Sequence, residues 1–438
     1  MSQVFTISID AMGGDHGPEV TIPALGLAAR RLGPDVRFLA HGEVQLIEAE
    51  LAQIRDLAGR VEIRHTDKRV ASDEKPATAL RRGKGSSMWN AVESVKLGEA
   101  AGAVSAGNTG ALMAISKLIL RMSADLDRPC LTASWPTVRG FTTVLDVGAN
   151  VDCDAARLVE FAILGEAFHR AAHGVERPTV GLLNVGSEDI KGHEEVREAH
   201  RILREGGAGL NYYGFVEGDD LTQGVVDVVV TDGFTGNVAL KTAEGVAKFI
   251  SGELRSALTS SLPSKLGALL ARKALLAFRE RLSPPAAAPL LGLNGVVVKG
   301  HGGATVRDFA DAIQVAADLA RSDFAAEITR SLGRLGRGVV EIQQQGADLS
   351  GYGGHCSAQA GLPGGDRLRH PGSVLRLCLC ALSGGRLRGW RSEPLRPGHR
   401  GGDDDPPHGL DRPRDLRAVR GWGRRRGAGA RGRERNDR

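Results

Sequence analysis

Aromatic residues make up only 4% of this chain of 438 residues. Surfaces that stack on nucleic-acid bases need exposed aromatic rings, so a nucleic-acid-binding module is not indicated. The five cysteines include no CxxC pair, which favours buried, reduced thiols in a cytosolic protein. Every apolar run is shorter than the roughly 20 residues of a membrane-spanning helix. The run Val4–Ile9 is too short and too uncharged for a signal sequence.

Lysine is absent from the C-terminal segment, residues 346–438, which contains 19 Arg and 10 Asp and Glu and no Ile, Phe or Met. Since the whole chain carries a net charge of +5, residues 1–345 are left with about −4. A segment rich in Arg, Gly and Pro without apolar periodicity cannot bury enough surface to order itself. We therefore expect a disordered tail outside the function, and no nucleic-acid partner. An arginine-rich nucleic-acid arm and out-of-frame translation of GC-rich DNA are the alternatives.

Before the tail, short β-branched runs alternate with amphipathic stretches, which predicts an α/β fold with a largely parallel sheet flanked by helices. The expected strands are Val4–Ile9, Val36–His41, Val61–His65, Ala101–Ser105, Thr142–Asp146, Thr179–Asn184, Asn211–Val216 and Val226–Thr231. The expected helices are Pro18–Leu32, Val44–Leu57, Ala79–Leu97, Gly110–Met122, Ala155–Ala172, Glu188–Glu205 and Gly236–Leu258.

Residues 249–289 carry leucines at helical spacing with basic residues between them, and Pro284, Pro285 and Pro289 then mark a break. A pair of core helices or a dimer interface would explain this pattern. A basic amphipathic hairpin that lies on an anionic membrane surface explains it equally well.

Three glycine-rich loops, residues 12–17, 105–110 and 232–237, each follow an apolar, strand-like run. Glycine lets the backbone approach a ligand closely, and free N–H groups at a helix start bind anions. One such loop is an ordinary strand-to-helix turn, whereas three on separate strands indicate a site for a phosphate-sized anion at the carboxyl ends of the strands.

Two further loops place charged and amide side chains after strands. Residues 146–152 include Asp146 and Asn150, and residues 184–192 include Glu188 and Lys191. Glu188 and Lys191 are three residues apart, on one face of the helix expected there. They form either a surface ion pair of little energetic value or a part of the site.

Other roles are open for some of these residues. Asp146, Asp152 and Asp154 are candidates for binding Mg²⁺, although loops rich in amide donors favour an anion. Asp15 and Asp154 also suit helix caps. His301, placed between glycines after a valine run, is a candidate for catalysis or phosphate binding. The chain has no GxSxG elbow and no Cys with an evident His partner, so a covalent acyl-enzyme is not indicated.

Four segments, in order along the chain, resemble the bacterial phosphate acyltransferases of phospholipid synthesis (the PlsX family). They are Ile9–Asp15, Ser105–Met113, Leu145–Cys153 and Asp232–Val238, and Ser86–Met88 and His301–Gly302 agree as well. The resemblance extends from about residue 4 to about residue 340. The tail has no counterpart in the family.

The resemblance implies transfer of a fatty acyl chain from acyl carrier protein to inorganic phosphate, after which a membrane glycerol-3-phosphate acyltransferase uses the acyl phosphate. It also implies a fold similar to isocitrate and isopropylmalate dehydrogenases, and a homodimer. We expect neither a cofactor nor a bound metal. The expected location is the cytoplasm, with peripheral attachment to the inner face of the cell membrane through a protruding hairpin.

In that reaction phosphate is the nucleophile, so the protein needs donors for phosphate and for the thioester oxyanion. Asn108 and Asn237 are the amide candidates, Lys191 would neutralise phosphate, and His301 would assist. The other residues assigned to the substrate and phosphate site are Asp10, Gly13, Gly14, Asp15, Gly107, Thr109, Gly110, Asp146, Asn150, Glu188, Asp232, Gly233, Thr235 and Gly236.

Two other functions are alternatives. A nicotinamide-dependent decarboxylating dehydrogenase of the same fold would need an arginine cluster for substrate carboxylates, and residues 1–250 have none near the loops. A non-catalytic module that binds acyl carrier protein at the membrane would not need three glycine-rich loops.

Deleting residues 346–438 should leave folding and turnover almost unchanged, because that segment lacks the apolar residues that would anchor it to a core. The melting temperature and specific activity of residues 1–345 should match those of the full chain, with a free energy of unfolding within about 0.5 kcal/mol. A truncated protein that cannot fold would contradict this boundary.

Overall fold

The computed structural model describes residues 5–123, 126–206, 209–282 and 287–322, together with Phe324, Ile328 and Arg330. Within these ranges the first part of the chain forms β1 (Phe5–Asp10), α1 (Pro18–Leu32), β2 (Val36–Gly42), α2 (Val44–Leu51), the short 3₁₀ helix η1 (Arg55–Leu57), β3 (Val61–His65), α3 (Pro76–Arg82), α4 (Ser87–Lys96), β4 (Gly102–Ser105) and α5 (Thr109–Leu120).

The middle of the chain forms β5 (Cys130–Thr137), β6 (Gly140–Leu145), α6 (Ala155–His173), β7 (Thr179–Leu183), α7 (Glu194–Gly206), β8 (Asn211–Val216), α8 (Asp220–Gln223), β9 (Val228–Val230) and α9 (Gly233–Thr259). The last described elements are α10 (Leu262–Leu270), α11 (Arg272–Leu282), β10 (Ala287–Leu291), β11 (Val296–Gly300) and α12 (Val306–Arg321). The segment 346–438 lies outside the described residues.

The described strands form one sheet in the order β3-β2-β1-β4-β11-β10-β5-β6-β9-β7-β8. All neighbours are parallel except β11 with β10, β10 with β5, and β5 with β6. The predicted α/β fold with a largely parallel sheet is thus confirmed. Three antiparallel pairings in succession reverse the chain direction, so the second parallel group (β6 to β8) runs opposite to the first group (β3 to β11).

The two central strands β5 and β10 were not predicted from the sequence. Pro289 indicated a break but lies within β10, opposite Val298 of β11. Proline is tolerated here because the pairing of β10 with β5 begins only at Leu290. The single helix expected over residues 79–97 is also divided, since α3 ends at Arg82 and Ser86 caps α4 by accepting a hydrogen bond from the Trp89 N–H.

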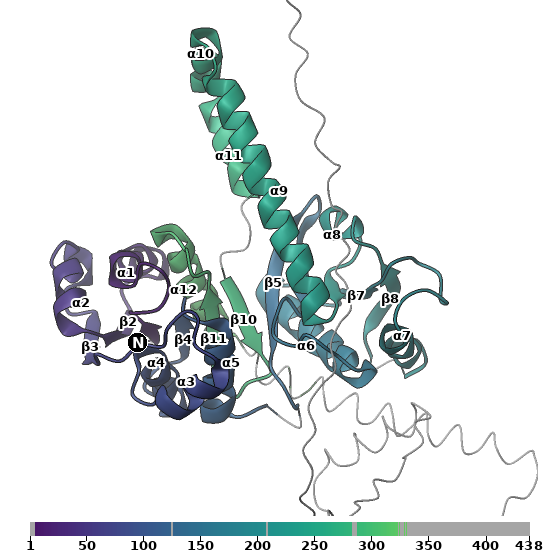
Figure 1. Cartoon of the computed structure of the whole chain (residues 1–438), viewed down its shortest axis with the longest axis horizontal. Helices are drawn as coiled ribbons and strands as arrows, with labels where there is room; N and C mark the ends of the chain where they lie inside the picture. The colour runs from purple at the N-terminus through teal and green to yellow at the C-terminus, as the bar shows by residue number, and fades with distance from the viewer. Residues whose placement is uncertain are drawn as a thin grey trace, which may run out of the picture. The chain divides into compact units, whose positions relative to one another are not determined.

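Helices cover both faces of the first strand group. Helices α1 and α12 pack against each other on one face, and α4 and α5 pack together on the other (Figure 1). In the second group α6 is largely buried, with Phe161 and Leu164 fully inaccessible to solvent. These apolar contacts on both faces give the loops at the strand ends a rigid support.

A helical arm projects from this framework: α9 extends away from the sheet, and α10 and α11 fold back along it (Figure 1). The α10 leucines are exposed, Leu262 and Leu270 each to 82%, so α10 does not pack into the core of its own chain. Among the described helices, none combines the length and apolarity required to cross a membrane.

Candidate active site

The first and second glycine-rich loops are joined by the carboxylate of Asp10, at the end of β1. Asp10 is 1% exposed, and its Oδ2 accepts a hydrogen bond of 2.6 Å from the Ser105 hydroxyl. The Gly107 N–H donates in turn to Ser105 Oγ at 3.1 Å. A Cβ on Gly13 would lie 2.6 Å from Asp10 Oδ2 and 3.0 Å from the Gly107 nitrogen. Only glycine therefore allows this close approach of the two loops.

A buried lysine that was not among the site residues predicted from the sequence faces Asp10. The Lys299 ammonium, at the end of β11, donates to the carbonyl of Ala106 at 3.3 Å and to that of Gly300, although the side chain is only 8% exposed. Burial lowers the pKa of Lys299 to about 8, opposed by the charge of Asp10. Burial likewise raises the pKa of Asp10, while the Ser105 hydrogen bond opposes the shift. The sequence feature that could have identified Lys299 is its position at the end of an apolar strand.

The loop after β11 joins the same cluster. The Asp15 N–H donates to the Gly302 carbonyl at 2.9 Å, and the Gly303 N–H donates to His301 Nδ1 at 3.1 Å. His301 is exposed, and its pKa is lowered by partial burial and by the charge of Lys241 on α9. Asp15 is not the cap of α1, because Gly17 occupies the N-cap position.

Asn108 caps α5, and its side-chain amide is fully engaged within the protein. Oδ1 accepts from the Ala111 N–H at 2.9 Å, and Nδ2 donates to the carbonyls of Ser72 and Glu74 at 2.8 and 3.0 Å. A Cβ on Gly110 would lie 2.8 Å from Pro76. The amide of Asn108 thus holds the 105–110 loop against residues 72–76, and a catalytic role for it stays a prediction.

In the second strand group, Asp146 organises the loop that follows β6. Its two oxygens accept hydrogen bonds from the N–H groups of Leu131, Gly148, Ala149 and Asn150 and from the Asn150 amide, at 2.6–3.2 Å. Asp146 is fully buried and Asn150 is 2% exposed. Both residues fix the loop from inside, so any action on a substrate would be through the loop backbone.

The magnesium alternative finds no support in the described part of the chain, where no group of three or more His, Cys, Asp or Glu could hold a metal. The Asp146 oxygens are occupied by N–H donors. Asp154 is the N-cap of α6 and accepts from the Arg157 N–H at 2.8 Å, which confirms the capping role.

The third glycine-rich loop forms the first turn of α9 and packs on the 146–150 loop. Asp232 caps the helix by accepting from the Thr235 N–H at 2.8 Å, and the Gly233 N–H donates to the Asn150 carbonyl at 2.7 Å. Asn237 follows on the exposed side, and its side chain lies 3.6 Å from where a Cβ on Gly148 would stand. Within the described residues the Asn237 amide has no hydrogen-bond partner and is available to a ligand.

Lys191 lies in an irregular loop rather than in the helix expected over 188–205, because α7 begins only at Glu194. The expected ion pair does form, with Lys191 Nζ 2.8 Å from Glu188 Oε2. This pairing raises the pKa of Lys191 and lowers that of Glu188. A Cβ on Gly186 would lie 2.5 Å from Lys191 Cδ, so a larger residue at position 186 would displace the Lys191 side chain from this position.

Helix α7 holds this loop in place through basic side chains on one face. Arg197 donates to the Ile190 carbonyl at 3.2 Å, and Arg204 pairs with Asp189 at 3.2 Å. Directly after β7, the Asn184 amide donates to the Lys191 carbonyl at 3.1 Å. The backbone at Lys191 is therefore anchored while its side chain stays 47% exposed.

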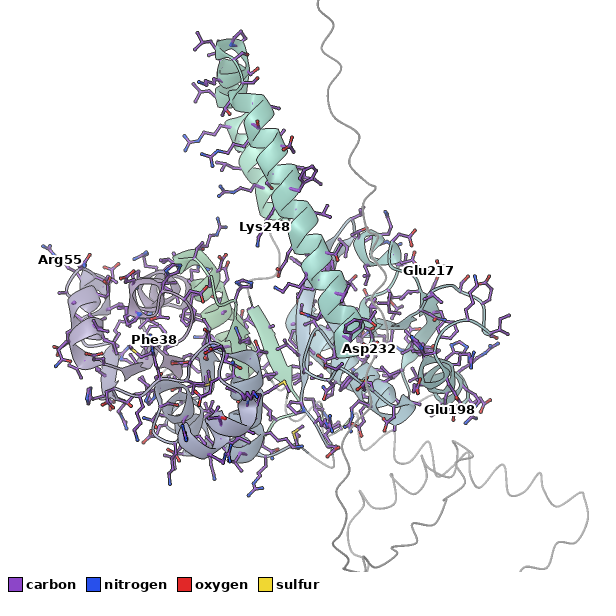
Figure 2. All side chains as sticks on the ribbon, in the orientation of Figure 1. Phe38, Arg55, Glu198, Glu217, Asp232 and Lys248 are labelled. Carbon is purple, nitrogen blue, oxygen red and sulfur yellow. The ribbon has the colours of Figure 1, made fainter. Side chains whose placement is uncertain are left out.

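Helix α9 connects the two sets of loops. Since the strand groups run in opposite directions, their carboxyl ends do not lie along one continuous edge of the sheet. Figure 2 shows Asp232 where α9 begins beside the second group, with Lys248 farther along the helix. Between them, Lys241 lies close enough to lower the pKa of both Lys299 and His301.

Burial disfavours the thiolate form of both described cysteines. Cys130 is fully buried in β5, and burial raises the pKa of its thiol. Burial and the nearby charge of Asp146 raise the pKa of Cys153 to about 12. Thiolate, not thiol, is the reactive form. The three other cysteines lie outside the described residues.

Comparison with known proteins identifies the family. A family model described as "Fatty acid synthesis protein" matches residues 5–327. The phosphate acyltransferase of Phenylobacterium zucineum is 70% identical over 335 residues, which cover 76% of this chain and 95% of that protein. That of Caulobacter vibrioides is 65% identical over 337 residues, covering 76% and 93%. The chain belongs to the phosphate acyltransferase family. Its members are enzymes of the transferase class.

One solved structure supports the fold. A phosphotransacetylase from Streptococcus pyogenes aligns with a TM-score of 0.50 at 17% identity, covering 72% of this chain and 94% of that one. A putative 4-hydroxythreonine-4-phosphate dehydrogenase from Salmonella typhimurium aligns with a TM-score of 0.44 at 14% identity, covering 73% and 100%.

The buried ammonium of Lys299 should make stability rise with pH above 8. Its pKa falls from the ordinary 10.5 to about 8 on folding, so the unfolded chain binds more protons in this window and folding is favoured as pH rises. The contribution should reach roughly 3 kcal/mol near pH 10.5. Lys299→Met should lack it, while the control Lys96→Met, at an exposed lysine of α4, should keep it. The measurement is guanidinium unfolding between pH 7.5 and 10, and parallel curves for wild type and Lys299→Met would contradict the assignment.

Proposed function

We propose that this enzyme transfers a fatty acyl chain from acyl carrier protein to inorganic phosphate for phosphatidic acid synthesis. A phosphate oxygen attacks the thioester carbonyl, the C–S bond breaks, and the released thiolate takes up a proton. The products are acyl phosphate and free acyl carrier protein. The observation that carries the proposal is the presence of two accessible donors, Lys191 in the loop after β7 and Asn237 near the start of α9, in a chain whose described cysteines have raised pKa values.

The roles of these donors follow from their surroundings. Lys191 would exchange the Glu188 carboxylate for phosphate, which requires no rearrangement of the anchored loop backbone. Asn237 would donate its free amide to the oxyanion that forms on the thioester carbonyl. His301, near the lysines of α9, would assist from the first strand group. The glycine-rich loops would supply backbone N–H donors.

Lys191→Ala and Asn237→Ala should each lower kcat by roughly 10²–10³, the usual loss when one preorganised donor is removed. Their melting temperatures should stay at the wild-type value, since both side chains are exposed. The assay follows acyl phosphate formation from acyl carrier protein thioester, and Lys96→Ala, an exposed lysine at the end of α4, is the control. Turnover near the wild-type rate in either variant would remove that residue from the site.

The same assay separates the alternatives. A phosphate acyltransferase requires inorganic phosphate, and its rate saturates as phosphate rises. A dehydrogenase would instead require a nicotinamide cofactor, and a non-catalytic module would release no free acyl carrier protein.

We further propose that residues 1–345 are the functional unit, and that the protein acts as a homodimer at the cytoplasmic membrane surface. The first proposal is supported by the relatives, which align over almost their whole length with that part of the chain. The membrane proposal is supported by the exposed leucines of α10 and by the basic residues of the arm. There the acyl phosphate would pass to a membrane glycerol-3-phosphate acyltransferase.

Replacing Leu266 and Leu270 together by Glu should abolish co-sedimentation with anionic vesicles. The two leucines are 61% and 82% exposed, so the substitution removes apolar burial in the lipid and adds like charge without disturbing the fold. High salt should also release the wild-type protein, because each basic residue near the surface contributes about 1 kcal/mol. If the variant loses its dimer or its fold instead, the arm is a subunit contact.

A further inference from the structure

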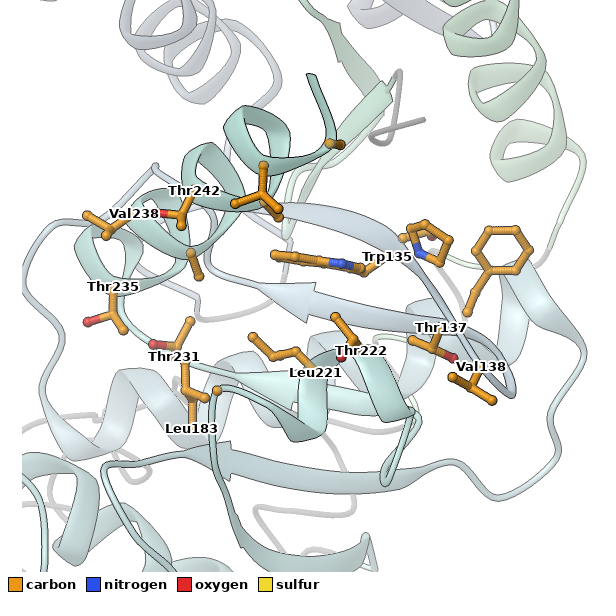
Figure 3. A pocket seen from close by; sticks show the side chains of 18 of the residues that line it. Trp135, Thr137, Val138, Leu183, Leu221, Thr222, Thr231, Thr235, Val238 and Thr242 are labelled. Atoms are coloured by element: carbon orange, nitrogen blue, oxygen red, sulfur yellow. The ribbon is translucent and has the colours of Figure 1, made fainter. Parts of the chain in front are cut away.

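Helix α9 has two faces of opposite character in its first half. Val238 and Thr242 belong to the face that lies beside Trp135 of β5, where small and apolar side chains predominate (Figure 3). The opposite face carries polar and charged residues three or four positions apart, namely Asn237, Lys241, Glu244 and Lys248. With 3.6 residues per turn, these four side chains form one polar stripe along the helix. The stripe begins at the amide of Asn237, which is available to a ligand.

The polar stripe is turned towards the loop that follows β11. Glu244 is only 8% exposed, which requires a partner for its carboxylate. The charges of Glu244 and Lys241 both act on His301, and Lys241 also acts on the buried ammonium of Lys299. The Gly302 carbonyl of the same loop accepts a hydrogen bond of 2.9 Å from the first glycine-rich loop. The stripe and the loops at the ends of β1 and β11 therefore share one electrostatic environment.

Lys241 is held in place but is not saturated by its partner. Its ammonium donates to Glu244 Oε2 at 2.8 Å, while the Lys241 side chain stays 52% exposed. An ammonium has three N–H donors, so one carboxylate oxygen leaves others for a ligand. The main charges acting on His301 are one carboxylate, that of Glu244, and three ammonium groups, those of Lys241, Lys248 and Lys299. This excess of positive charge attracts an anion.

His301 supplies a second donor at the same place. The Gly303 N–H donates to His301 Nδ1 at 3.1 Å, so the proton of the neutral imidazole is on Nε2. Partial burial and the charge of Lys241 lower the pKa of His301, which keeps the ring neutral at pH 7. An ammonium, an imidazole N–H and a side-chain amide together suit the several acceptor oxygens of a phosphate group.

We propose that Lys241 binds a phosphate group between α9 and the loop after β11, with Asn237 one helical turn before it and His301 as a further donor. The inference rests on the proposed function and adds a ligand-binding residue to its site. The phosphate group is either the inorganic phosphate that attacks the thioester or the phosphodiester of the arm that carries the thioester. Glu244 orients the ammonium before the substrate arrives and competes with phosphate for it.

The test compares Lys241→Gln, Glu244→Gln and the double variant. KM is measured separately for inorganic phosphate and for palmitoyl thioester of acyl carrier protein. Loss of a charge-assisted hydrogen bond should raise one of these KM values by roughly 10- to 100-fold in Lys241→Gln and in the double variant. Glu244→Gln should not raise it, because the ammonium is then no longer shared. Lys96→Gln, at an exposed lysine of α4, is the matched control.

The substrate whose KM rises identifies the source of the phosphate group. A rise for inorganic phosphate assigns Lys241 to the nucleophile. A rise for the carrier thioester assigns it to the phosphodiester, and palmitoyl-pantetheine, which lacks that phosphate, should then be used equally well by wild type and Lys241→Gln. Either result supports the proposal.

Two results would overturn it. One is an unchanged KM for both substrates in Lys241→Gln, and the other is an equal rise in Lys241→Gln and Glu244→Gln, which is the result of a purely structural ion pair. If Lys241→Gln does not fold, because the buried Glu244 carboxylate has lost its cation, the double variant decides. Wild-type protein that forms no acyl phosphate would instead refute the proposed function. Calorimetric titration with inorganic phosphate and with phosphopantetheine would then still test the site, and equal affinities of wild type and variant for both would overturn it.

Discussion

Five N–H donors converge on the buried carboxylate of Asp146, and the position of α9 depends on this cluster. The hydrogen bonds fold residues 146–150 into a tight loop, and the first turn of α9 rests directly on it through Gly233 and Gly236. A buried carboxylate is costly unless its lone pairs are satisfied, so the loop has little freedom to rearrange. Asn237 and the projecting arm both take their places from this contact.

The chain direction reverses within the sheet, and for this reason α9 connects loops from both strand groups. Strands β10 and β5 reverse the direction between the two parallel groups, so loops on the two groups cannot meet along a single sheet edge. Helix α9 starts at a loop of the second group and brings Lys241 near Lys299 and His301 of the first. Helix α9 thus connects the loops of the two groups.

The first strand group illustrates how buried charge is used to shape loops. Asp10 and Lys299 lie beneath the glycine-rich loops and bond to Ser105 and to the carbonyls of Ala106 and Gly300. Each charge is expensive to bury alone, and each lowers the cost of the other. Glycines at 13 and 107 let the loops come close enough to share these contacts. Rigid loops present their backbone N–H groups in one arrangement.

The sequence alone determined the α/β class, most strands and helices, the glycine-rich loops and the Glu188–Lys191 pair, because these depend on local periodicity and on short spacings. It did not reveal β5 and β10, whose pairing is long-range and whose Pro289 signals a break. Only the tertiary structure decided which polar side chains lack a hydrogen-bond partner among the described residues. Asn108 and Asn237 look alike in sequence, yet the Asn108 amide donates hydrogen bonds to the carbonyls of Ser72 and Glu74. The burial of Lys299 and the approach of Lys241 to it likewise depend on packing between distant segments, which no local pattern encodes.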